Sequence, residues 1–258
     1  MKLTILITFL ILSKILFSQE LKEYDLKPYN KELNFKIIDE NDVVEKSDSL
    51  EALIIVFKNP RYKNAELSIS NNLQLKEIKL FGCNQELLKF ISESNLQRLT
   101  HLFFERYEDS VLAIPPFPIV EHLTIQSSEL ISLNMVNASL DKLNILDIET
   151  PKLKKWSTVQ FFPQLELIEL NAPLLEHFPI ENIPKIFQFS YKCSFKELPL
   201  NLCNYMELQH ISFSNYIPIQ VDKCFKKKIK KAYYSNLTVY NRIDGKVISE
   251  TLSKDRKE

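Results

Sequence analysis

The sequence predicts an α/β or mainly β solenoid, in which a curved parallel sheet of eight to nine short strands is backed by an irregular convex side. Three apolar positions, spaced i, i+3 and i+5, return every 21 to 24 residues along most of the chain. Polar and apolar residues alternate from i+2 to i+6, which is the period of a half-buried strand. Prolines often interrupt the residues after this strand, so a turn and a return limb are expected there.

Eight copies of this triplet are expected to form successive strands. Copies of similar length stack in parallel, and each buries its apolar edge against its neighbours. The triplets begin at Ala52, Leu75, Leu99, Val120, Leu143, Leu165, Ile186 and Leu208. Position i+13, outside the triplet, is also apolar in six copies, at Leu88, Leu112, Leu133, Trp156, Phe178 and Val221.

The best copy carries the resemblance to a known family. The stretch Leu75-Lys-Glu-Ile78-Lys-Leu80-Phe-Gly-Cys83-Asn84 resembles the L-x-x-L-x-L-x-x-N/C core of leucine-rich repeats, and the resemblance covers roughly residues 50 to 220. It implies a curved sheet whose concave face binds proteins, peptides or glycans. Only Cys83 matches the asparagine or cysteine that the family places at i+8, so an irregular arc without an asparagine ladder is expected.

The start of the chain reads as an export signal. Residues 1–18 hold Lys2, an apolar run broken by Lys14, and a small residue at Ser18, which is typical of a cleaved secretory peptide. An uncleaved anchor is the alternative. No later segment is long and apolar enough to span a bilayer. We therefore expect a secreted, periplasmic or cell-envelope protein.

The remaining chain is expected to divide into three parts. Residues 19–49 form an N-terminal cap, 50–225 the solenoid, and 226–258 a C-terminal cap with a polar tail. Two β-rich segments, 237–240 and 246–249, flank a turn-forming stretch and predict a hairpin. A lysine-rich run at 226–231 is interpreted as the solvated edge of the last coil rather than a nucleic-acid or lipid patch.

Export makes the four cysteines candidates for oxidation. Cys203 lies five residues before Leu208, and Cys224 lies five before Ile229, where a ninth, degenerate copy of the triplet is expected. Equivalent positions in consecutive coils stack about 5 Å apart. A Cys203–Cys224 disulfide is therefore predicted, with two buried free thiols as the alternative. Cys83 and Cys193 fall in distant coils and are expected to be unpaired.

The phase of the triplets places three columns of side chains on the concave face, at i+2, i+4 and i+6. Glu105, Asp147, Glu149 and Glu169 make this face weakly acidic, which favours a partner with basic groups. Phe81 and Phe103 are either exposed anchors for a partner or covered by the N-terminal cap. The predicted partner-binding residues are Phe81, His101, Phe103, Glu105, His122, Asp147, Glu149 and Glu169.

The same face offers residues for a metal site and for a catalytic site. His101 and His122 would be neighbours beside Glu77, a possible zinc or copper set, but half-exposed histidines on a sheet are ordinary and no metal or other cofactor is predicted. Asp147 and Glu169 would be adjacent carboxylates, the basis of an alternative carbohydrate-active or other hydrolase. No local catalytic motif supports that alternative.

Composition limits the remaining functions. The formal charge is zero, so net charge gives no reason to expect a nucleic-acid partner. Only two glycines are present, Gly82 and Gly245, and neither lies in a phosphate-binding loop. The favoured prediction is an exported, monomeric, non-catalytic repeat protein that binds a protein, peptide or glycan through its concave face.

Overall fold

A computed structural model describes most of the chain between Pro28 and Cys193 and three later strands. The described residues are 28–57, 62–107, 109–159 and 161–193, followed by the backbone of 210–215, 237–243 and 246–252. The predicted signal at 1–18, the i+13 residue Val221, and both Cys203 and Cys224 lie outside them. Cys83 and Cys193 are buried thiols.

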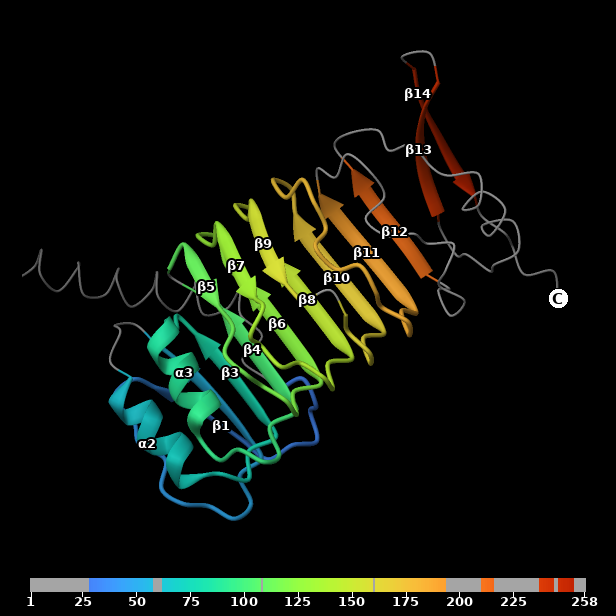
Figure 1. Cartoon of the computed structure of the whole chain (residues 1–258). Coiled ribbons are helices and arrows are strands. Elements are labelled where there is room, and N and C mark those ends of the chain that lie inside the picture. The colour runs from blue at the N-terminus through green and yellow to red at the C-terminus, as the bar shows by residue number, and fades with distance from the viewer. Residues whose placement is uncertain are drawn as a thin grey trace, which may run out of the picture.

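A parallel sheet of nine strands, hereafter the main sheet, dominates the fold (Figure 1). Its strands follow one another in chain order, and every neighbouring pair is parallel. They are β1 (Phe35–Asp39), β2 (Ala52–Val56), β3 (Glu77–Phe81), β4 (His101–Glu105), β6 (His122–Gln126), β8 (Ile145–Glu149), β10 (Leu167–Ala172), β11 (Gln188–Cys193) and β12 (His210–Asn215). The prediction of a mainly parallel sheet with eight to nine strands is confirmed.

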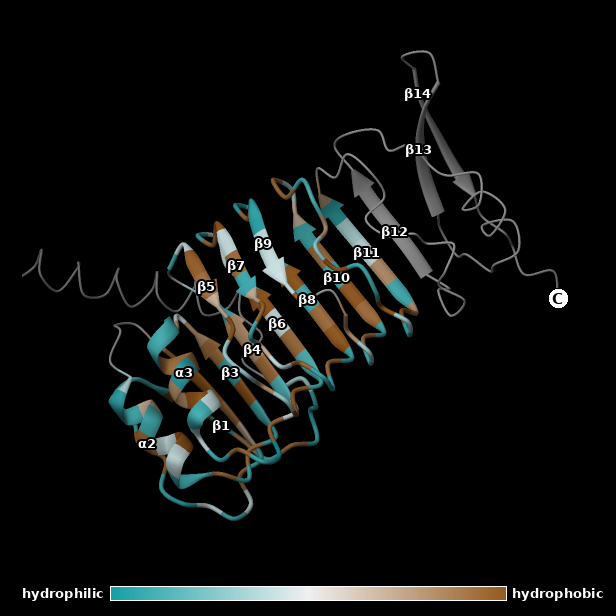
Figure 2. Cartoon of the chain, in the orientation of Figure 1, coloured by the Kyte–Doolittle hydropathy of each residue, from teal (hydrophilic) through white to brown (hydrophobic). Residues whose placement is uncertain are grey.

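The strand register follows the predicted triplets from the second copy onward. Ile78 pairs with Leu102, and the same position continues through Leu123, Leu146 and Ile168. The triplet residues are at most 5 % exposed wherever their side chains are described. These positions therefore form the core side of the main sheet, and Figure 2 shows hydrophobic colour along β4, β8 and β10.

The predicted position of the first triplet is two residues too late. Leu53 pairs with Ile78 and Ile55 with Leu80, so the copy begins at Leu50 and not at Ala52. Strand β1, from within the predicted N-terminal cap, adds one more strand to the sheet and pairs Ile38 with Ile55. The sheet thus begins upstream of the predicted solenoid.

A second layer covers the core side of the main sheet. It consists of α2 (Lys63–Asn71) and α3 (Gln85–Glu93), then a three-stranded parallel sheet of β5 (Val111–Ala113), β7 (Ser132–Met135) and β9 (Lys155–Thr158) (Figure 1). Leu112, Leu133 and Trp156, which share position i+13, pair in register in this smaller sheet, where the sequence predicts a turn and a return limb. One continuous hydrophobic core lies between the two layers.

The two helices were not predicted, and segment length accounts for them. Twenty-five residues separate Leu50 from Leu75 and 24 separate Leu75 from Leu99, whereas the later copies are shorter. The Asn84 side chain caps α3 by accepting a hydrogen bond from the Leu87 amide at 3.1 Å, and Leu87, Leu88 and Ile91 bury one face of the helix. In the next copy, prolines 115, 116 and 118 exclude a helix.

One serine satisfies backbone groups of the turn that follows β6. The Ser127 hydroxyl donates to the Tyr107 carbonyl oxygen at 2.7 Å and accepts from the amides of Glu129 and Leu130, both at 3.2 Å. Ser127 is 4 % exposed, so the bonds are shielded from water. A hydroxyl therefore satisfies this turn locally.

The predicted hairpin lies near the end of the chain. Strands β13 (Leu237–Ile243) and β14 (Lys246–Leu252) pair antiparallel, with Tyr240 opposite Ser249. Among the described residues, no helix has the length and apolar character needed to cross a membrane.

Candidate functional site

The side of the main sheet away from the second layer, here called the open face, carries the predicted site residues. Glu77, His101 and His122 pair across β3, β4 and β6, and Asp147 pairs with Glu169 across β8 and β10. Each predicted column is therefore continuous in space. The open face nevertheless divides into a covered half on β2–β6 and an accessible half on β8–β11.

A tyrosine from the predicted N-terminal cap covers part of the first half. The Tyr29 ring stacks on His101 at 5.5 Å between centroids, meets His122 edge-on at 4.6 Å and lies 6.1 Å from Phe103. The Tyr29 amide donates a 2.7 Å hydrogen bond to Oε1 of Glu77, which is fully buried. Ring packing and this hydrogen bond hold the 28–30 segment against the sheet.

Four predicted binding residues are inaccessible in this structure. Phe81, Phe103, Glu105 and His122 are 1, 5, 8 and 6 % exposed. The expectation that Phe81 and Phe103 are exposed anchors is wrong, and for Phe103 the alternative, cover by the N-terminal cap, is confirmed in Tyr29. Phe81 packs with Ile54 and Val56, which also project onto the open face.

Charge inside the covered half is compensated. Lys79 and Glu105 form an ion pair at 3.3 Å with both side chains nearly buried. The Lys79 ammonium also lies 5.7 Å from the Phe81 ring centroid and 5.5 Å from that of Phe103. These contacts turn Glu105, predicted as part of an exposed acidic patch, into an internal partner of Lys79.

The two histidines are held in their neutral form. Burial lowers the pKa of His122 to about 4, with a further contribution from His101, whose ring centroid is 5.5 Å away. Burial also lowers the pKa of His101, against the opposing charge of Glu121. Among the described residues, no group of three or more His, Cys, Asp or Glu side chains could hold a metal ion.

The accessible half contains an acidic cleft of about 410 Å³ on β8, β10 and β11, hereafter the acidic cleft. Three carboxylates line it, from Asp147, Glu149 and Glu169, together with Asn171 and Lys192. The Asn171 amide donates to Oε1 of Glu149 at 3.3 Å, and the Gln188 amide donates to Oε1 of Glu169 at 3.3 Å. Two of the three carboxylates are thus oriented by neutral donors.

Asp147 is the most perturbed acid of the cleft. Burial raises its pKa to about 6, and the negative charges of Glu169, Glu149 and Glu105 add to the effect. Glu149 and Glu169 are exposed, whereas Asp147 is half-buried between neighbouring strands. A cation arriving at the cleft would relieve the repulsion that Asp147 experiences.

The structure therefore groups Asp147, Glu149 and Glu169 as predicted, leaves His101 half-buried under Tyr29, and removes the other four residues from the accessible surface. The sequence reasoning missed Tyr29, which lies in no periodic pattern.

Comparisons of the chain with protein-family models, curated proteins and solved structures find no match.

Proposed function

We propose that this chain is an exported, non-catalytic solenoid of the leucine-rich-repeat type, which binds a protein or peptide bearing cationic groups. The partner occupies the acidic cleft on the accessible half of the open face. The in-order parallel strands, the second layer at i+13 and the sequence of residues 1–18 support the solenoid and its export. The observation that most supports the binding proposal is that three carboxylates line one cleft.

Charge balance favours a cationic partner. Asp147 and Glu169 are direct cross-strand neighbours, and like charges in that position repel one another. Amide donors from Asn171 and Gln188 orient the carboxylates without neutralising them. A lysine or arginine side chain in the cleft gains these carboxylates as ligands and removes the repulsion.

The test is a titration with acetylated, amidated hexalysine, with hexaglutamate as the matched negative probe. We expect hexalysine binding that weakens as salt rises, and a loss of about fivefold or more in the Asp147→Asn/Glu169→Gln double variant. Glu166→Gln, an exposed glutamate just outside β10, is the control and leaves binding unchanged. Equal hexalysine affinity in wild type and double variant contradicts the proposal.

The same carboxylates support one second candidate, a carbohydrate-active or other hydrolase. Asp147, with its pKa raised to about 6 beside Glu169, has the properties of a general acid paired with a carboxylate. This candidate requires turnover of a glycoside or ester substrate that falls steeply in Asp147→Asn. Unchanged hydrolysis in that variant removes the candidate and leaves the binding proposal intact.

A further inference from the structure

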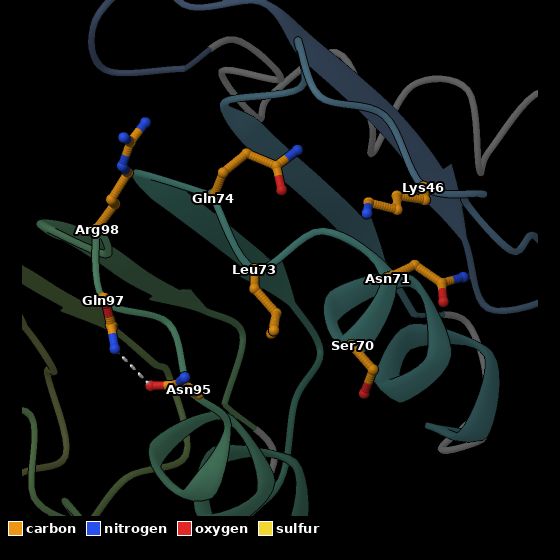
Figure 3. A pocket seen from close by; sticks show the side chains of 8 residues that line it. All are labelled: Lys46, Ser70, Asn71, Leu73, Gln74, Asn95, Gln97 and Arg98. Carbon is orange, nitrogen blue, oxygen red and sulfur yellow. Dashed lines mark hydrogen bonds between the residues drawn. The ribbon is translucent and has the colours of Figure 1, made fainter.

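A second hollow, far from the acidic cleft in the sheet order, lies where β2, β3 and β4 begin. This groove, hereafter the edge groove, has a volume of about 590 Å³, within the range of ligand sites. Its walls come from the turn that precedes each of these three strands, at residues 46, 70–74 and 95–98. In Figure 3 the Leu73 side chain lies between the α2 turn that carries Ser70 and the loop that carries Asn95 and Gln97.

The lining of the edge groove has a one-sided chemistry. Two cations, Lys46 and Arg98, and four amide side chains face it, whereas none of its described lining residues carries a carboxylate. This is a local departure from a chain with equal numbers of acidic and basic residues. The four amides are Asn71, Gln74, Asn95 and Gln97.

The positive charge of the groove is not cancelled by close partners. Within the described part of the chain, neither Lys46 nor Arg98 has a carboxylate within ion-pair distance. Glu51 feels the charge of Arg98 but is paired with Lys76 at 2.5 Å. The groove therefore keeps a net attraction for anions.

The amides make the groove rigid and still leave groups for a ligand. The Asn71 amide donates to the Val44 carbonyl oxygen at 3.0 Å, and the Gln74 amide donates to the carbonyl oxygen of Ser47. The turn that carries Lys46 is thus tied to the end of α2. Each of these amides uses one N–H in such a bond, so its second N–H and its carbonyl oxygen remain for the hydroxyls of a ligand.

Ligand classes can be separated by what the groove lacks. Its described lining includes no aromatic ring, so a nucleobase has no surface there to stack on. Among the same lining residues Leu73, 41 % exposed, is the one large apolar side chain, too little for an acyl chain. Hydroxyls bonded by amides, together with an anion bonded by Arg98 and Lys46, match a sugar that carries an acidic group.

The geometry points to a second binding site, in which the edge groove takes an anionic oligosaccharide. Its carboxylate or sulfate group lies between Lys46 and Arg98, and its hydroxyls meet the amides of Asn71, Gln74 and Gln97. This site is independent of the acidic cleft, because it uses other strands, the strand-start edge of the sheet and the opposite charge.

The experiment titrates the full chain with three hexasaccharides, namely oligogalacturonate, a sulfated galactan fragment and neutral maltohexaose. We expect at least one anionic oligomer to bind at least about tenfold more tightly than maltohexaose, and Arg98→Gln to lower that affinity about tenfold. Lys46→Gln should also lower the affinity for the anionic oligomer. Lys155→Gln, an exposed lysine on β9, is the matched control and has no effect.

Each outcome decides the proposal. Binding of oligogalacturonate alone assigns the anion as a carboxylate, and binding of the galactan alone assigns it as a sulfate. Absence of binding by both anionic oligomers overturns the proposal, as does equal binding of maltohexaose or unchanged affinity in Arg98→Gln. The side chains of Lys46, Arg98 and Lys155 are exposed, and melting temperature confirms that each variant is folded. Asp147→Asn/Glu169→Gln leaves this affinity unchanged if the two sites are separate.

Discussion

Two replacements on the open face, His122→Gln and Asp147→Asn, should change the pH dependence of stability in opposite directions. His122 has a pKa of about 4 in the folded chain against 6.5 as a free group. Because the unfolded chain binds the proton more readily, this histidine contributes about 3 kcal/mol of stability at pH 7 that is lost as pH falls from 6.5 toward 4.

Asp147 acts in the reverse sense. Its pKa rises from 3.8 to about 6 on folding, so the folded chain holds the proton more tightly than the unfolded chain. Stability therefore falls as pH rises from 3.8 to 6, by about 2 kcal/mol after screening by solvent is allowed for. In the wild-type chain the contributions of His122 and Asp147 to the pH dependence of stability oppose one another. Burial also raises the pKa of Glu77, so Glu77, like Asp147, lowers stability as pH rises.

The assay is urea unfolding between pH 4 and pH 7.5, followed through Trp156, the single tryptophan, which is 7 % exposed. The stability of His122→Gln relative to wild type should improve by about 3 kcal/mol on going from pH 7 to pH 4, whereas that of Asp147→Asn should worsen by about 2 kcal/mol. His177→Gln and Asp141→Asn, both exposed, are the controls. Parallel pH profiles for wild type and both variants refute the reasoning.

Three further replacements test the packing of the core, the hydrogen bonds of the Ser127 turn, and the shielding of His122 by Tyr29. Leu146→Ala, at a fully buried position of β8, should cost about 2–5 kcal/mol of unfolding free energy, while Leu174→Ala, 46 % exposed, stays within about 0.5 kcal/mol in the same denaturation assay. Ser127→Ala should cost about 1–3 kcal/mol by thermal or urea unfolding, because the buried Leu130 amide and the partly buried Glu129 amide lose their acceptor. Tyr29→Ala should speed modification of His122 by diethyl pyrocarbonate, measured by mass spectrometry. Tyr29→Phe is the control, because it keeps the ring and therefore the slow rate. Equal rates in the two variants would contradict the shielding of His122 by the Tyr29 ring.

Much of the main sheet could be predicted because every strand must bury the same side. An apolar i, i+3, i+5 triplet sets the strand phase wherever polar residues alternate with it, as in the strand that holds Ile78 and Leu80. The first copy lacks that contrast, since Ala52–Val56 is apolar throughout. The observed triplet Leu50, Leu53 and Ile55 is as apolar as the predicted one at Ala52, Ile55 and Phe57. A shift of two residues also keeps Leu53 and Ile55 on the core side, so two phases fit the sequence equally well.

The covered half of the open face could not be predicted from periodicity. The hydrogen bond from Tyr29 to Glu77 joins residues 48 positions apart, and nothing around Tyr29 repeats. Strand phase alone places His101 and His122 on an accessible surface, and the Tyr29 ring that covers them lies outside that pattern. By contrast, the pairing of Asp147 with Glu169 follows from strand phase alone, so the acidic cleft was the part of the site that sequence reasoning located. The edge groove depends on three turns of unequal length and was not foreseen.

Hydrogen–deuterium exchange of the full chain, with and without saturating hexalysine, tests the central claim about the acidic cleft most directly. We expect slower exchange in β8, β10 and β11, where the carboxylates lie, and unchanged exchange in α2 and α3. Protection confined to α2, α3 or the edge groove, with none in β8–β11, would contradict that claim.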